Sequence, residues 1–319
     1  MIKRFKYKKF LHLVDHNGAI FSLISPLSSF KDHKVLTSFG KPFKETLKQI
    51  EKISADKGVM VILHATGNNK KFYSKKEEIF KIFKKNFLLL HVSPEHFIIK
   101  NRLKELYKIK SLMKKYKIKV LTPSRTLKKV FLRYGIKTRV VQVGLNLKTI
   151  KKNNLRDNKK IITVCTSEDE KYQYIKGMDL FIKLIKGLGL EKESIILGTH
   201  LKGFGKIKSR KVSKKDFLRY LKNSKVYIQL SRTESYNLSA IYAKRLKIPI
   251  IVSNIEGHKD NVKYGFRVCG IKEAEKILKK ILENNNSSIK KVINKNYKDS
   301  IKRESLENFR NSLNSLLSL

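Results

Sequence analysis

The chain of 319 residues is long enough for two domains of ordinary size, and its 41% hydrophobic residues can supply a core for each. That content excludes disorder as a description of the whole chain. Lys and Arg number 73 against 26 Asp and Glu, a formal net charge of +47. Both halves share the excess, so we expect a field that attracts polyanions: nucleic acid, anionic lipid headgroups or phosphorylated small molecules.

Short apolar runs alternate with lysine-rich, helical stretches in the first half of the chain. The first run follows a basic leader, but Asp15 and the polar residues after it interrupt the run, so we predict a strand and not a signal peptide. Apolar residues at helical spacing predict helices within Ser74–Asn86 and Asn101–Tyr116. The predicted strands are Phe10–Val14, Lys34–Phe39, Gly58–His64, Phe87–Val92, Ile118–Thr122 and Arg139–Val143.

A polar stretch, Leu145–Lys160, is the best candidate for a linker, and the same alternation restarts after it. The predicted strands there are Ile161–Thr166, Ser194–Thr199, Lys225–Ser231, Pro249–Asn254 and Arg267–Gly270. The predicted helices are Gly177–Gly187, Lys214–Asn223, Leu238–Leu246 and Lys272–Glu283, with one or two more from Ile289 to Leu319.

This pattern predicts an α/β protein with two Rossmann-like, doubly wound parallel sheets. We place the first domain at residues 1–147 and the second at residues 148–300. The remaining residues, 301–319, form a helix expected to pack back toward the first domain. Ligands of such sheets bind beyond the carboxyl ends of the strands, so we expect the site in a central cleft that the two domains face.

Several classes of site and location are excluded or disfavoured. Cys165 and Cys269 both lie in apolar runs and are expected to be buried; two cysteines offer no disulfide framework or thiolate zinc site. No apolar run approaches the length of a membrane span. The acidic triplet Glu168–Glu170 has no histidine partners and is read as a solvated loop, so no metal site is expected. A cytoplasmic location follows, with peripheral membrane contact left open.

The most informative segment is residues 225–258. A predicted strand ends at Ser231, a short loop holds Glu234, and Asn237 stands where a helix begins. Asn is a favoured helix N-cap, so the backbone N–H groups of Leu238 and Ser239 would be available to an anion such as a diphosphate. A plain strand–loop–helix with a solvated glutamate explains the same spacing equally well.

This segment resembles the donor-binding segment of GT-B glycosyltransferases, in particular the retaining family four (glycosyl transferases group 1), with its pattern S-x-x-E-x-x-G-L-x-x-x-E-A followed by G-x-P-V-I-x-S. Upstream, Lys176-Gly177 matches the family's KG pair, and residues 121–147 resemble its passage from the first domain into the linker. "KYGFRV" at residues 263–268 resembles its G-x-x-G-F-x-V ending. The matching positions are Ser231, Glu234, Leu238, Ala243, Pro249, Ile250, Ile251, Ser253 and Gly257.

The resemblance implies a retaining, metal-independent glycosyltransferase without a cofactor, whose donor is a nucleotide-diphosphate sugar. Negative charge grows on the leaving oxygen, and the family neutralises it with basic side chains and a helix N-terminus. Lys176 matches the family lysine, and Lys171 replaces the family arginine with a charge that lacks the planar fork. Glu234 matches the first glutamate of the E-x7-E pair, near the donor sugar. The second domain would bind the donor and the first the acceptor.

Other positions depart from the family or match it loosely. Tyr242 replaces the second glutamate, and a phenol cannot receive two ribose hydroxyls as a carboxylate does. Gly18 stands where the family has a glycine-rich loop near the donor phosphates. His91 resembles a histidine that faces the cleft and is counted as catalytic, whereas His64, at the end of another strand, is weighted lower. Ser124 is expected to cap a helix.

The sequence does not decide between several hypotheses for the acceptor and the binding partner. An anionic membrane surface is slightly favoured, because basic amphipathic stretches lie in the first domain. A nucleic-acid-modifying transferase would also use the positive charge, and a genome biased toward lysine needs no charged partner at all. A non-catalytic binding protein on the same scaffold is the alternative that Tyr242 raises. The sugar, the nucleotide base and the oligomeric state are left open.

Overall fold

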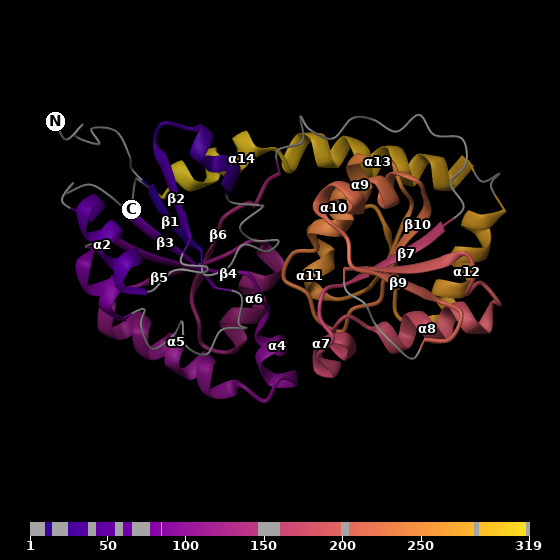
Figure 1. Ribbon diagram of the computed structural model, residues 1–319, viewed down its shortest axis with the longest axis horizontal. Helices are drawn as coiled ribbons and strands as arrows, with labels where there is room; N and C mark the ends of the chain where they lie inside the picture. Colours follow the sequence, from indigo (N-terminus) through magenta and orange to yellow (C-terminus); the bar gives the residue numbers. More distant parts are fainter. Residues whose placement is uncertain are drawn as a thin grey trace. The chain divides into compact units, whose positions relative to one another are not determined.

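The computed structural model describes residues 10–14, 25–37, 43–54, 60–65, 77–83, 85–145, 160–198, 204–283 and 287–316 (Figure 1). The chain forms two compact units. Unit 1 comprises Met1–Asn146 together with Leu306–Leu319, and unit 2 comprises Leu147–Ser305.

Unit 1 contains a six-stranded parallel sheet in the order β2-β1-β3-β4-β5-β6. Its central strands are buried on both faces, as expected where helices cover a parallel sheet. The strands are β1 (Phe10–Val14), β2 (His33–Thr37), β3 (Met60–Ala65), β4 (Lys85–Leu90), β5 (Lys119–Thr122) and β6 (Thr138–Val140).

Helices pack on the sheet of unit 1 through apolar stripes. Leu11, Val61 and Leu88 point to the face where residues such as Phe97 and Phe131 of the helices complete one core cluster. Ser124 caps α6 by accepting a hydrogen bond from the Leu127 N–H at 3.0 Å, which confirms its predicted role. The elements are η1 (Ser25–Ser29), α2 (Phe43–Ser54), helical residues 77–82, α4 (Pro94–Ile99), α5 (Leu103–Tyr116), α6 (Arg125–Arg133) and α14 (Leu306–Asn314).

Unit 2 contains a second six-stranded parallel sheet, in the order β12-β11-β10-β7-β8-β9. From β7 the chain first adds strands on one side, and then β10 returns to the other side of β7. The carboxyl ends of β7 and β10 therefore meet at a topological switch point. The strands are β7 (Lys160–Cys165), β8 (Ser194–Gly198), β9 (Lys208–Arg210), β10 (Ser224–Gln229), β11 (Ile250–Ser253) and β12 (Phe266–Val268).

Helices cover both faces of the unit 2 sheet (Figure 1). Apolar residues of α8 and α12, such as Phe181 and Leu278, share a core cluster with one face, while α10 contacts α9 and α13 on the other. The helices are α7 (Glu170–Ile175), α8 (Met178–Gly187), α9 (Lys214–Lys222), α10 (Leu238–Arg245), α11 (Glu256–Lys259), α12 (Ile271–Leu282) and α13 (Ser287–Arg303).

The predicted α/β class with two parallel sheets is confirmed, with strand limits shifted by up to three residues where they are described. One expectation is wrong: Cys269 is exposed, because β12 ends at Val268 and the thiol lies beyond it. The acidic triplet is exposed, as expected, but it leads into a helix: Asp169 is the N-cap of α7 and accepts the Tyr172 N–H at 2.7 Å, and Glu170 begins the helix.

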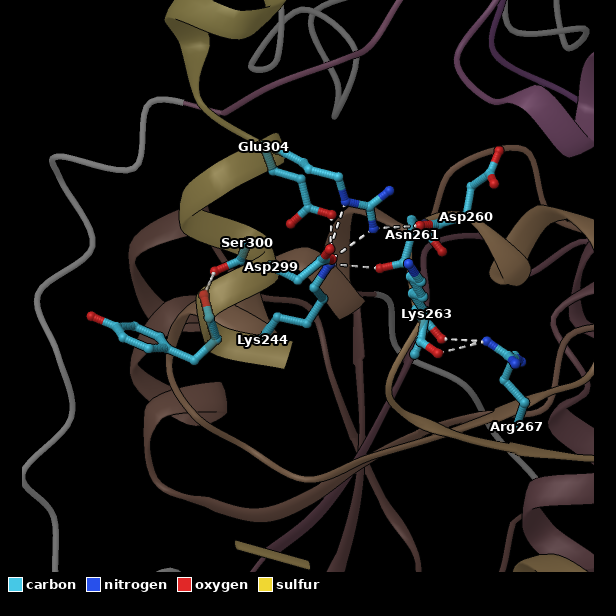
Figure 2. Close-up of polar contacts among 11 residues, drawn as sticks. Lys244, Asp260, Asn261, Lys263, Arg267, Asp299, Ser300 and Glu304 are labelled. Carbon is cyan, nitrogen blue, oxygen red and sulfur yellow. Dashed lines mark hydrogen bonds and ion pairs between the residues drawn. The ribbon is translucent and has the colours of Figure 1, made fainter. Parts of the chain in front are cut away.

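A buried lysine joins α10 to α13 in unit 2 (Figure 2). The Lys244 ammonium donates to Asp299 Oδ2 at 2.8 Å, to Glu304 Oε1 at 2.7 Å and to the carbonyl oxygen of Asn261 at 2.8 Å. All three N–H groups of this fully buried side chain therefore have an acceptor. Arg303 adds a second cation through two bonds to Asp299. This cluster holds the helix whose N-terminus forms part of the site described below.

We expect Lys244→Met to destabilise the protein by about 3–5 kcal/mol, because it leaves the buried Glu304 carboxylate without its cation and Asp299 with Arg303 alone. Urea unfolding followed by circular dichroism measures the loss. Lys279→Met is the control, since Lys279 pairs with Glu275 on the exposed surface of α12 and should contribute little. Equal losses for the two variants would contradict this account of the cluster.

Candidate functional site

Polar side chains gather at the switch point of unit 2. Two connections leave the sheet side by side there: residues 166–177 follow β7, and residues 230–237 follow β10. Crevices at this position of an open parallel sheet are the usual ligand sites of the architecture.

An ion pair joins the two connections. The Lys176 ammonium contacts Glu234 Oε1, and the two side chains are 18% and 9% exposed. Ser231 Oγ donates a second hydrogen bond to Glu234 Oε1 at 3.2 Å. Two residues that lie far apart in the sequence are therefore brought into direct contact, and both were predicted to be catalytic.

Both members of the pair stay charged in spite of their burial. Burial alone would lower the pKa of Lys176, but the Glu234 carboxylate outweighs it and raises that pKa above its ordinary value. Burial would likewise raise the pKa of Glu234, but the charge of Lys176, with His258 and Ser231, holds it below its ordinary value. The site therefore carries a fixed cation and a fixed anion throughout the neutral pH range.

Two glycines let neighbouring segments approach the connection 230–237 closely: Gly177 from the connection after β7, and Gly257 from α11. Gly177 has φ +67°, and a Cβ there would lie 1.9 Å from the carbonyl oxygen of Leu230. A Cβ on Gly257 would lie 1.9 Å from the carbonyl oxygen of Glu234. No other residue type fits either position without moving the backbone that carries Glu234.

Helix α10 begins beside the pair. Asn237 Oδ1 accepts the Ala240 N–H at 3.0 Å, so Asn237 is the predicted N-cap. The helix offers no acceptor to the N–H groups of Leu238 and Ser239, which lie in its first turn. With the positive end of the helix dipole, these amides are suited to bind an anionic group.

A buried histidine orients the cap. His258 Nδ1 donates to the carbonyl oxygen of Ser253 at 2.9 Å, because that oxygen can only accept. Its Nε2 is therefore an acceptor and receives a hydrogen bond from Asn237 Nδ2 at 3.2 Å. Burial lowers the pKa of His258, so the ring is neutral at pH 7. This residue was not predicted from the sequence, although it is the last residue of the segment 225–258.

Two side chains of β10 link the pair to the cap. Gln229 Nε2 donates to the carbonyl oxygen of Lys176 at 2.8 Å. The hydroxyl of Tyr227 lies 3.0 Å from Gln229 Oε1 and 3.2 Å from Asn237 Oδ1. Neither residue was predicted from the sequence. An amide and a phenol within an otherwise apolar strand are the feature that could have indicated them.

The remaining predicted residues have other surroundings. Lys171 is exposed on α7. Tyr242 lies on α10 with its ring edge-on to Phe217 of α9, at a centroid distance of 6.0 Å, and burial raises its pKa to about 12. His91 follows β4 in unit 1 and is hydrogen-bonded to the buried His64. Gly18 lies outside the described residues. Within the described ranges, no three His, Cys, Asp or Glu side chains are arranged to hold a metal ion.

Part of this site lies in a segment that matches a protein-family model. Residues 207–308 match the family model "Glycosyl transferases group 1", a segment that contains Glu234, Asn237 and Tyr242. The match confirms the predicted resemblance and the predicted enzyme class, a glycosyltransferase. No curated protein matches the chain.

Solved structures confirm the GT-B fold over nearly the whole chain. HepE from Anabaena, solved with UDP-glucose, is 15% identical with a TM-score of 0.71, over 98% of this chain and 100% of its own. Sucrose-phosphate synthase from Thermosynechococcus elongatus is 13% identical with a TM-score of 0.71, over 97% and 98%. A trehalose-6-phosphate synthase, studied for glycosyl transfer with retention, is 11% identical with a TM-score of 0.67, over 98% and 99%.

We expect Gly177→Ala to disturb both the fold and the site. The left-handed backbone alone costs an alanine about 1–2 kcal/mol, and the contact with Leu230 adds to that loss. Urea unfolding measures the loss. Gly187→Ala is the matched control, because a Cβ at this last residue of α8 meets nothing within 4 Å. A Gly177→Ala variant as stable as the control would contradict the close approach.

Proposed function

Starting from the glycosyl transferases group 1 segment at residues 207–308, we propose that the chain is a retaining, metal-independent glycosyltransferase that uses a nucleotide-diphosphate sugar. The observation that carries the proposal is the Lys176–Glu234 ion pair beside the start of α10, at the switch point of unit 2. Neither residue needs a cofactor for the role given to it below.

The donor diphosphate binds at the start of α10. The N–H groups of Leu238 and Ser239 donate to its oxygens, and Lys176 supplies a full positive charge. Because negative charge grows on the diphosphate as the sugar–phosphate bond breaks, these groups bind the transition state more tightly than the ground state. The UDP-glucose complex of HepE, a protein of the same fold, supports this choice of donor.

Glu234 changes partner when the donor binds. Without donor, its carboxylate is bonded to Lys176 and Ser231. A diphosphate carries more negative charge than a carboxylate and therefore competes for Lys176. The carboxylate of Glu234 is then released to accept hydrogen bonds from hydroxyls of the donor sugar. The ion pair thus keeps both groups charged and in place until the donor arrives.

Tyr242 and Lys171 have weaker roles in this proposal. With its pKa raised to about 12, the phenol of Tyr242 is neutral and can make one hydrogen bond to a ribose hydroxyl where a carboxylate makes two. Lys171, exposed on α7, adds positive charge near the diphosphate. We assign acceptor binding to unit 1, with His91. Retention is supported by the trehalose-6-phosphate synthase, whose transfer proceeds with retention.

Thermal shift measurements with UDP, GDP, ADP and TDP at low salt test the donor site, because a ligand that binds the native state raises the melting temperature. We expect one nucleotide to stabilise the wild type. Lys176→Ala should weaken its binding roughly tenfold or more, since a charged hydrogen bond is lost. Glu234→Ala should retain nucleotide binding but abolish transfer from the sugar nucleotide.

Lys183→Ala is the control for loss of charge, because Lys183 is exposed on α8. Should no nucleotide stabilise the wild type, the donor site is refuted. Nucleotide binding without any sugar transfer or hydrolysis would instead support the alternative, a binding protein that has kept the scaffold and lost turnover.

A specific surface favours an acceptor at an anionic membrane. Ile98 of α4 and Leu103 and Tyr107 of α5 are 45%, 39% and 59% exposed. Leu103 and Tyr107 are four residues apart, so they share one face of α5. Lys104 and Lys108 directly follow Leu103 and Tyr107 in the sequence, and Lys110 Nζ lies 5.5 Å from the Tyr107 ring. Apolar side chains within a basic surface are typical of helices that bind membrane surfaces. No helix within the described ranges is both long and apolar enough to cross a bilayer.

Flotation with phosphatidylserine vesicles tests the membrane contact. We expect the wild type to float and Leu103→Ser/Tyr107→Ser to bind several-fold less, because insertion of both side chains is lost. Ile301→Ser is the control, an equally exposed apolar residue on α13 of unit 2. Equal binding of all three proteins would refute the surface, and salt-dependent binding to DNA without flotation would favour the nucleic-acid reading.

A further inference from the structure

Four histidines form a line of hydrogen bonds through unit 1. His33 Nδ1 lies 2.9 Å from His12 Nε2, His12 Nδ1 lies 3.1 Å from His64 Nε2, and His64 Nδ1 lies 2.9 Å from His91 Nε2. Neighbouring ring centroids are 5.2 to 5.3 Å apart. The first three side chains are completely buried.

The strand register explains the line. Its members come from β2, β1, β3 and the residue after β4, which are neighbours in the sheet. Each next histidine lies two residues beyond the register partner of the previous one, so it is on the same face and closer to the carboxyl ends of the strands. His12 lies beyond Phe10, the partner of His33; His64 lies beyond Ile62, the partner of His12; and His91 lies beyond Leu89, the partner of His64.

The hydrogen bonds give the line a direction. A neutral imidazole has one N–H and one acceptor nitrogen, so all rings must donate the same way. Burial and the neighbouring His33 keep the pKa of His12 well below its ordinary value. Burial also lowers the pKa of His33 to about 4, against the opposing effect of Asp32. Both rings are therefore neutral at pH 7. In every ring of the line the same nitrogen, either Nε2 or Nδ1, is the protonated one.

The charged groups beside His33 determine which of the two directions the hydrogen bonds take. His33 Nε2 faces Asp32 Oδ1 at 3.7 Å. Asp32 is in turn paired with Arg310 of α14, at 3.4 Å. A carboxylate can only accept, so it favours a proton on His33 Nε2. His33 Nδ1 then accepts from His12, and the same polarity is passed on to His64 and His91.

We propose that Asp32, acting through His33, His12 and His64, holds His91 in the tautomer that is protonated at Nε2. The Nδ1 of His91 is then a hydrogen-bond acceptor at the carboxyl end of β4. Asp32 is a positioning residue, and the role of His91 toward an acceptor hydroxyl rests on the function proposed above. The tautomer itself does not depend on that function.

Nitrogen-15 NMR of histidine-labelled, full-length protein reports the tautomers directly, because protonated and unprotonated ring nitrogens differ strongly in chemical shift. In the wild type we expect proton-bearing Nε2 and unprotonated Nδ1 in His12, His33, His64 and His91, assigned by single His→Gln variants. In Asp32→Ala, the remaining Arg310 favours an unprotonated His33 Nε2, so the line should reverse to Nδ1–H.

Two further variants separate this mechanism from a general structural change. Glu307→Ala removes the other carboxylate near Arg310, 3.6 Å away, and should leave all four tautomers unchanged. His12→Phe cuts the line, so the His91 nitrogens should show a mixture of tautomers. Protonated Nδ1 on His91 in the wild type, or unchanged His91 signals in Asp32→Ala, would overturn the proposal. Neither result affects the donor site, which nucleotide binding to unit 2 tests separately.

Discussion

The arrangement of unit 2 depends on one attraction between opposite charges, that of Lys176 for Glu234. Either charge alone would destabilise the folded state, because it is poorly exposed to water. The attraction between the two charges offsets this cost of burial. Their contact requires the backbone after β7 to touch the backbone after β10, which Gly177 permits, while Gly257 lets α11 approach the same connection. The same closeness sets the start of α10 beside the cation. The packing of these two connections therefore positions both the anion-binding groups and the carboxylate.

Several buried polar side chains in each unit are joined in defined hydrogen-bond networks. In unit 2, Tyr227, Gln229 and His258 connect the charged pair to the cap of α10. In unit 1, the imidazoles satisfy one another from strand to strand. Such networks restrict the side chains to one geometry, because any rotation leaves a donor or acceptor without a partner in the protein interior. Both sheets therefore offer rigid supports for the groups at their carboxyl ends.

The amino-acid sequence predicted those parts of the molecule that local pattern determines. Continuous apolar runs marked eleven strands, and the motif spacing found Lys176, Glu234 and Asn237. The strand β9, Lys208–Arg210, has no apolar run and was missed. The histidine line was also missed, because its neighbours are 21 to 52 residues apart in the sequence and meet only through the strand register. Contacts between residues so far apart in the sequence do not affect the hydrophobic periodicity from which strands and helices are predicted.

The return of α14 to unit 1 has a consequence for biosynthesis. Phe309 and Leu313 are completely buried there, and Ser312 Oγ receives the Gln142 N–H at 3.0 Å. A nascent chain that has emerged only as far as the linker lacks these groups, whereas unit 2 is continuous and is synthesised in one stretch. Unit 1 is therefore completed only after unit 2 has been synthesised, and termination before α14 would leave its hydrophobic surface open to chaperones and proteases.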